Sequence, residues 1–180
     1  MRRILSLVLA LALLAGAMPA LAQDAAEREI VNQLKLLVER FLESNDYNYT
    51  NDGDSYTVEF YLDSSLGSST VYMTVDYDSV QVLAYADIVA SKANRDKMAI
   101  LTTLLNWELF YTQFTMDYES GRFASRALQY VESTLPGMEE MDVIFHMALT
   151  NLDDYGDTLA QVALMGRDPF EAFEEAMANR

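Results

Sequence analysis

The stretch NYTNDGDSYTVE, residues 48–59, matches a calcium-binding loop at some of its positions. Such twelve-residue loops carry glycine at the sixth position and a bidentate glutamate at the twelfth, where this chain has Gly53 and Glu59. The first position is Asn48 instead of aspartate, and the alternation from Tyr56 onward predicts a strand where a helix should follow. The stretch is therefore better interpreted as a turn that leads into a strand, with Gly53 at positive φ.

Residues for nucleophilic catalysis are sparse, because an activated Ser, Thr or Cys needs a base beside it. The chain has one histidine, His146, and no cysteine. His146 follows Asp142 by one helical turn on a polar face, so we expect a solvated pair, with a two-ligand metal site as the alternative. The sequence has neither a G-x-S-x-G motif nor a glycine-rich phosphate loop. No catalytic residue, cofactor or metal site is predicted.

Neighbouring carboxylates occur at Glu139-Glu140 and at Asp153-Asp154. A glycosidase needs two carboxyl groups set across a pocket, which neighbours on a helix surface do not provide. With 28 acidic residues in the chain, such neighbours arise by chance. We expect these side chains to solvate helix surfaces.

The first 22 residues have the pattern of a secretory signal peptide, with Arg2 and Arg3, an apolar run and a small-x-small cleavage site before Gln23. A membrane anchor helix is the alternative. Loss of residues 1–22 removes two arginines and lowers the net charge from −16 to −18, which disfavours nucleic acid and anionic lipid as partners. We expect an exported protein of the periplasm, cell envelope or extracellular space, with no membrane span once the signal is removed and no disulfide.

Apolar periodicity predicts the elements of the remaining chain. A helix over about residues 25–44 precedes a three-strand meander, and a second helix follows, capped by the Asn94 side chain and ending near Asn106. A hairpin follows, and then a long helix from Pro136 to Gly166 that Gly156 should weaken or bend. Asp168-Pro169 starts a short last helix. The predicted strands are 55–63, 69–78, 79–86, 109–117 and 122–130, and alternation in the fourth places Phe110 on the core side, opposite Tyr111.

These elements predict an α+β fold of order α-β-β-β-α-β-β-α. Its five-stranded, twisted antiparallel sheet should be packed by helices on one face, with a short helix added at the C-terminus. We assign residues 1–22 to the signal peptide, 23–166 to one α+β domain and 167–180 to the last helix.

The stretch LLNWELFYTQFTMDYESGRFASRA, residues 104–127, closes a helix on Asn106, reaches Phe114-x-Met116-Asp117 and turns into a strand that contains Arg126. With LDDYGDTLAQVALMG, it resembles the YbjN family, which is similar in fold to type III secretion chaperones. The resemblance covers about residues 25–166 and implies a role in regulation or protein interaction, without catalytic residues. This chain differs from cytoplasmic members in its predicted export signal.

One tyrosine falls on the polar side of most predicted strands: Tyr61, Tyr72, Tyr85 and Tyr111. Tyrosine is favoured at binding surfaces, although strand propensity alone also accounts for it. We hypothesise that these residues bind a polypeptide partner or form a homodimer. The predicted function is an exported, non-catalytic interaction module, chaperone-like or regulatory. The alternative is an envelope protein that binds a small ligand or calcium, and an enzyme ranks third.

Overall fold

The computed structural model describes residues 25–131 and 134–179, which form an α+β fold. The sheet is antiparallel and six-stranded, in the order β1-β2-β3-β4-β6-β5. Five helices accompany it in the described part of the chain. None of them is long and apolar enough to cross a membrane. The predicted signal peptide, residues 1–22, lies outside the described residues.

The element order follows the predicted sequence of helices and strands, with one strand added. After the N-terminal helix (residues 25–44), the elements are β1 (Tyr49–Asp52), β2 (Ser55–Tyr61), β3 (Ser68–Asp76), β4 (Ser79–Ala86), α2 (Arg95–Glu108), β5 (Thr112–Met116), β6 (Phe123–Tyr130), α3 (Met138–Asp154), α4 (Gly156–Met165) and α5 (Pro169–Ala178).

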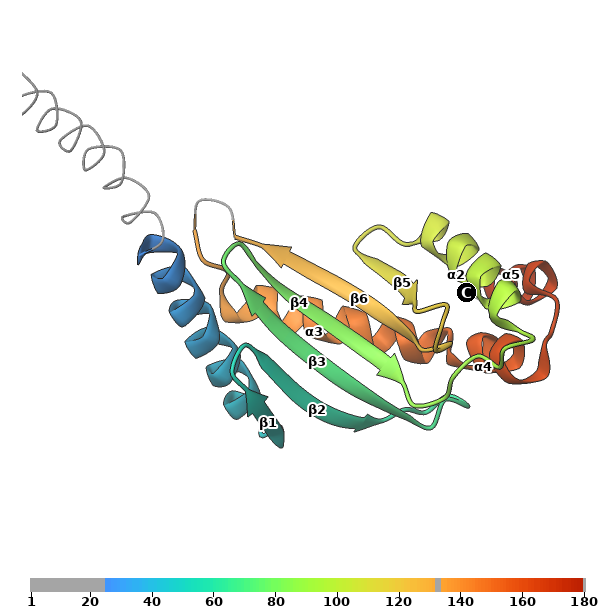
Figure 1. The fold of residues 1–180 in the computed structure, drawn as a ribbon, viewed down its shortest axis with the longest axis horizontal. Helices are drawn as coiled ribbons and strands as arrows, with labels where there is room; N and C mark the ends of the chain where they lie inside the picture. The colour runs from blue at the N-terminus through green and yellow to red at the C-terminus, as the bar shows by residue number, and fades with distance from the viewer. Residues whose placement is uncertain (1–24, 132–133, 180) are drawn as a thin grey trace, which may run out of the picture.

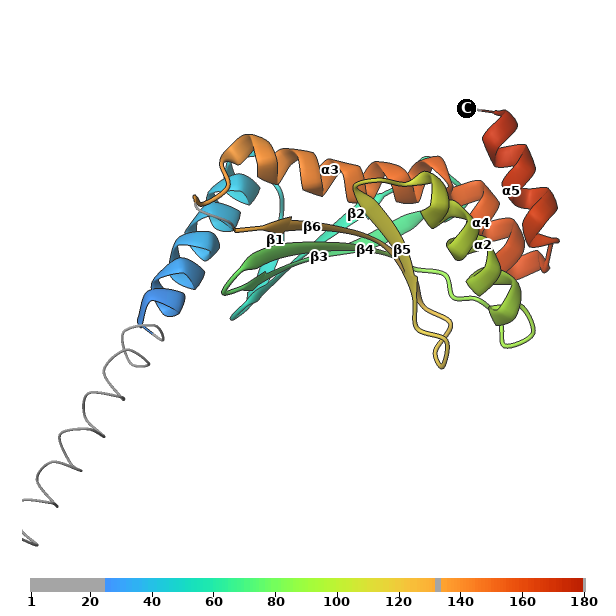
Figure 2. The same ribbon diagram turned by 90° about the horizontal axis from the view of Figure 1, so that it is seen from above.

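Helix α3 lies across one side of the sheet, between the N-terminal helix at one end and α2, α4 and α5 at the other. Figure 1 views the strands from the other side, with α3 passing behind them, and Figure 2 shows the two layers edge-on. Buried, inward residues of the strands alternate with half-buried, outward ones. The alternation is strict along the whole of β4. The predicted coverage of one face by helices is confirmed.

The sheet has six strands, not the five predicted, because residues 49–52 also form a strand. They pair with β2 in the register Asp52↔Ser55, which leaves a two-residue loop of Gly53 and Asp54. Gly53 has φ of +73°, which suits glycine at the first loop position of a tight hairpin. A four-residue strand rich in Asn and Asp carries too little apolar alternation to be recognised from sequence.

The core joins the N-terminal helix to the sheet and to α3 through aromatic contacts. Phe41 and Phe145 lie with ring centroids 5.2 Å apart, and Tyr47 stacks on Phe145 at 5.3 Å. Phe60 completes the group at 5.5 Å from Phe145. This cluster fixes the β2 end of the sheet under α3.

Helix α2 is attached to the edge strand β5 by one side chain. Asn106 Nδ2 donates to the Phe114 carbonyl (2.9 Å), and the Phe114 N–H donates to Asn106 Oδ1 (2.6 Å). The asparagine thus takes the place of a neighbouring strand at the outer edge. Asn94, predicted to cap α2 with its side chain, instead donates to the Ala163 carbonyl at the end of α4 (3.0 Å).

The predicted long helix is two helices, α3 and α4, which meet at Tyr155. The β2–β3 loop packs against this junction. A Cβ at Gly156 would lie 2.1 Å from Ser64 Oγ and 3.2 Å from Leu66 Cδ1, so only glycine admits the loop here. Asp153 Oδ1 accepts the Ser64 N–H at 2.9 Å, which holds the loop in place.

The C-terminal helix α5 begins as predicted. Asp168 is the N-cap, and its side chain accepts hydrogen bonds from the N–H groups of Phe170 (3.0 Å) and Glu171 (3.2 Å), with Pro169 in the first turn. The N–H groups of a first helical turn lack partners within the helix, so this cap stabilises the start.

We predict that Gly156→Ala destabilises the protein by about 1–3 kcal/mol, because the added methyl group collides with Ser64 although alanine favours helix more than glycine does. The change would be measured as the shift in free energy of unfolding in urea. Ser64→Gly in the same chain should recover part of the loss. Equal destabilisation in the single and double variants would contradict the proposed contact.

Candidate functional site

Residues 48–59, the stretch with calcium-loop spacing, form the β1–β2 hairpin and most of β2. Glu59 lies on the exposed side of β2 and so does not close a loop around the hairpin tip. Among the residues that the structure describes, no group of three or more His, Cys, Asp or Glu side chains is arranged to hold a metal ion.

His146 lies on the exposed side of α3 with Asp142, as the spacing predicts. Its Nδ1 is 3.3 Å from Asp142 Oδ1 and 3.0 Å from the Asp142 carbonyl oxygen. Its Nε2 lies 3.4 Å from the hydroxyl of Tyr47. Burial and the nearby Asp142 carboxylate raise the pKa of Tyr47. Through its contacts with Asp142 and Tyr47, the His146 imidazole links α3 to the segment just before β1.

Two of the four carboxylates predicted to solvate helix surfaces, Glu140 and Asp153, instead bind backbone N–H groups. Glu140 Oε2 accepts the Gly137 N–H at the start of α3 (2.9 Å). Asp157 Oδ1 accepts the Ser65 N–H (2.8 Å) and the Ser65 hydroxyl, and these hydrogen bonds lower the pKa of Asp157. These acids, with Asp153, hold the chain locally and do not converge as a catalytic pair.

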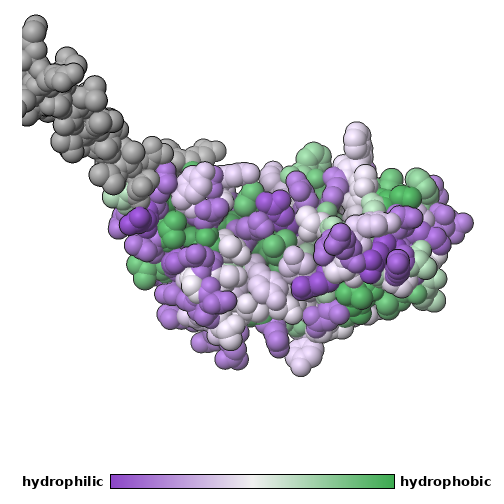
Figure 3. Space-filling view, in the orientation of Figure 1, coloured by the Kyte–Doolittle hydropathy of each residue, from purple (hydrophilic) through white to green (hydrophobic). Residues whose placement is uncertain are grey.

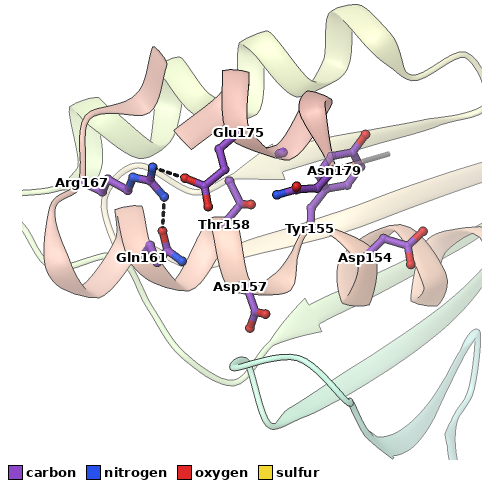
Figure 4. Close-up of a pocket in the computed structure, with 9 residues that line it drawn as sticks. Asp154, Tyr155, Asp157, Thr158, Gln161, Arg167, Glu175 and Asn179 are labelled. Carbon is purple, nitrogen blue, oxygen red and sulfur yellow. Dashed lines mark hydrogen bonds and ion pairs between the residues drawn. The ribbon is translucent and has the colours of Figure 1, made fainter. Parts of the chain in front are cut away.

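A hollow of about 460 Å³ lies between α4 and α5 (Figure 4). Its one arginine, Arg167, is already engaged: the guanidinium donates to Gln161 Oε1 and to Glu175 Oε2. Asp157 turns toward the β2–β3 loop in the same view. The cation here is neutralised within the chain, so it is not available to a ligand.

The sheet side without helices has a different character from the rest of this acidic chain. We call it the open face. Its outward positions along the middle of the strands are Thr57, Glu59, Thr70, Tyr72, Thr74, Gln81, Leu83, Tyr85, Gln113, Thr115, Ala124, Arg126 and Leu128. Of these, Glu59 and Arg126 are charged. Three more charged residues border the face: Asp76 at the end of β3, Asp87, which accepts from the Ser68 and Thr70 hydroxyls, and Arg122. In Figure 3 the surface over the central strands is largely pale, between the two ends of the hydropathy scale.

Two of the four predicted tyrosines meet at the centre of the open face. Tyr72 on β3 and Tyr85 on β4 contact edge to face, with ring centroids 5.7 Å apart. The Arg122 guanidinium lies 4.4 Å above the Tyr85 ring. These contacts hold two large amphipathic rings in fixed positions, which lowers the entropy that a binding surface loses on contact.

The other two tyrosines lie apart from this pair. Tyr61, 96% exposed, ends β2, and Tyr111, 78% exposed, precedes β5 at the other side of the sheet. Phe110, predicted to face the core, is 93% exposed in the segment between α2 and β5. Strand β5 begins only at Thr112, so Phe110 lies before the alternation starts.

A hollow of about 470 Å³ adjoins the open face at β5 and β6. Its lining residues come from the end of α2 and from both strands: Asn106, Leu109, Phe110, Tyr111, Thr112, Gln113, Arg126, Leu128 and Tyr130. The Nε atom of Arg126 is buried without a hydrogen-bond partner. Within the described chain, neither Arg126 nor Glu59 forms an ion pair. An unpaired guanidinium beside a hollow is suited to bind a carboxylate.

Sequence reasoning placed Glu59 and Arg126 on strands but did not assign them to the site. Both Arg122 and Arg126 fall inside the predicted strand 122–130, and this could have drawn attention to them. The position of Arg122 over Tyr85 could not be predicted, because it depends on the pairing of β4 with β6, which are far apart in sequence.

Comparison with protein-family models and comparison with curated proteins both found no match.

We predict that Asn106→Leu destabilises the protein by about 1–3 kcal/mol, because it leaves the N–H and C=O groups of Phe114 without their side-chain partner. Denaturant unfolding would measure the loss, and hydrogen exchange would show faster exchange of the Phe114 amide. Asn32→Leu, on the exposed side of the N-terminal helix, serves as the control and should change stability by less than about 0.5 kcal/mol. Unchanged exchange at Phe114 would refute the role of Asn106.

Proposed function

We propose that the protein is an exported, non-catalytic interaction module that binds a polypeptide on its open face. The observation that carries this proposal is a tyrosine-centred sheet surface with few acidic side chains in a chain of formal charge −16. Acidic side chains are abundant elsewhere on the molecule, so their scarcity on this face favours contact with another protein over contact with water alone.

Tyrosine supplies the contact area in this proposal. The rings of Tyr72 and Tyr85 are half-buried and held by each other, with Arg122 over Tyr85 and with Thr, Gln and Leu side chains around the pair and few acids. Depletion of charge around aromatic residues is typical of the centre of protein interfaces. The resemblance to the YbjN family supports the same class of function, because that family is similar in fold to chaperones that bind polypeptides.

The hollow beside Arg126 supports a second candidate, an envelope protein that binds a small anionic ligand. Its volume of about 470 Å³ falls within the range of small-molecule sites. The hollow lies at the margin of the open face, so it is equally well placed to hold a side chain of a bound polypeptide. We favour the polypeptide because the tyrosine-centred surface extends well beyond the hollow.

We predict that a photoreactive residue in place of Leu83, at the centre of the open face, crosslinks to another polypeptide in cells that export the protein. The same residue in place of Val143, exposed on α3, serves as the matched control and should give little product. Tyr72→Ser combined with Tyr85→Ser should reduce the Leu83 product at least about tenfold, since aromatic residues at interface centres dominate binding energy. Equal crosslinking from positions 83 and 143 would refute the proposal.

A further inference from the structure

We infer that the polypeptide on the open face is a second copy of this chain, held by two reciprocal ion pairs between Glu59 of one copy and Arg126 of the other. This inference rests on the proposed function and names its partner. It depends on the register of the strands, on charge and on the area of the face.

The strand register places Glu59 and Arg126 toward opposite sides of the open face. One row across the sheet reads Thr57, Tyr72, Leu83, Arg126 and Gln113. The adjacent row reads Glu59, Thr70, Tyr85, Ala124 and Thr115. Glu59 and Arg126 are thus three strands and one row apart, which is roughly 15 Å at the usual strand and residue spacings. They are too far apart to pair within one chain.

The tyrosine pair lies midway between these charges. Tyr72 stands second in its row and Tyr85 third in the other, so a line through both rings passes close to the midpoint between Glu59 and Arg126. A two-fold axis along that line, in the plane of the face, brings Glu59 of one copy onto Arg126 of the other, and the reverse. Each tyrosine then lies near its own counterpart, at the centre of the interface.

Charge favours this surface for contact between identical chains. Two copies that each carry a charge of −16 repel one another over most of their surfaces. Acids are few on the open face, and among its charged residues Glu59 and Arg126 form no ion pair within the described residues. Reciprocal pairing neutralises both residues at once.

Area is sufficient for a stable contact. Five strands with about seven residues each give a projected surface of roughly 500–600 Å² for β2 to β6. Because side chains protrude from the sheet, the accessible surface is larger than this projected surface. It approaches the roughly 800 Å² per partner of a standard interface. The same symmetry carries Tyr61, next to Glu59 along β2, toward β5 and the hollow beside Arg126.

The edges of the sheet are poor alternatives for self-association. At β5 the side chain of Asn106 already occupies the N–H and C=O groups of Phe114. At the other edge, β1 is four residues long and ends in Asn51 and Asp52, and short, polar edge strands oppose pairing with another chain. Association through the open face is therefore favoured over association through either edge of the sheet.

The test is a charge exchange, with sedimentation equilibrium of the purified protein as the measurement. We expect a wild-type dimer with Kd at or below about 10 µM. Glu59→Arg and Arg126→Glu should each weaken the dimer at least about tenfold, because each places like charges in contact. The variant with both changes should regain most of the wild-type affinity. Arg40→Glu and Glu174→Arg, exposed on helices, are the matched controls and should leave the dimer unchanged.

A second measurement reports the symmetry directly and tolerates altered stability. The chain contains no cysteine, so single cysteines can be introduced cleanly. A mixture of Glu59→Cys and Arg126→Cys chains should form crosslinked dimers with a short thiol-to-thiol reagent, while either variant alone should form few. Tyr72→Cys alone should crosslink to itself. Equal crosslinking of the mixture and of the separate variants would overturn the arrangement.

The outcomes separate this inference from the function on which it rests. A monomeric wild type, or a double variant that does not recover, overturns the dimer. If Leu83 nevertheless crosslinks to a different polypeptide, the open face is still a docking surface and only the identity of the partner is wrong. If position 83 crosslinks to nothing, both proposals fail.

Discussion

A sheet has two faces, and the helices of the described chain cover only one of them. Every other feature of the molecule follows from that constraint. The covered side takes the aliphatic and aromatic residues that supply the free energy of folding. The uncovered side must stay soluble while its strands remain well formed, and threonine, glutamine and tyrosine meet both demands because they suit strands and retain a polar group.

The edges of the sheet show a related solution. Backbone N–H and C=O groups at an edge strand attract other chains. Asn106 satisfies them at β5 with a side chain from α2, and the edge is thereby closed by the same helix that packs against it. At the opposite edge, β1 is only four residues long. Contact with other molecules is then directed to the face, where side chains and not backbone groups determine which partner fits.

Much of this architecture could be predicted from local patterns, since period-two alternation identified β2, β3 and β4 and the Asp168-Pro169 pair marked the start of α5. The predictions that were wrong concern features that depend on contacts between distant parts of the chain. Strand β1 has little apolar alternation and exists because β2 offers a partner. Phe110 was assigned to the core by parity alone, although β5 starts two residues later. Likewise, four tyrosines shared a pattern, but strand order brought only Tyr72 and Tyr85 together.

The junction of α3 and α4 has a consequence for how the protein can vary. The loop after β2 fits a gap left by Gly156, and its N–H groups are taken by Asp153 and Asp157. Lengthening that loop by one residue would shift every one of these contacts, so natural variation and engineered insertions should be excluded there. At the tip of the β1–β2 hairpin, Gly53 has open space around it, while Asp54 pairs with Lys35 and its carbonyl accepts the Val75 N–H, so an insertion there disturbs fewer contacts. Tolerance to change is thus distributed according to what each loop touches, not according to its exposure.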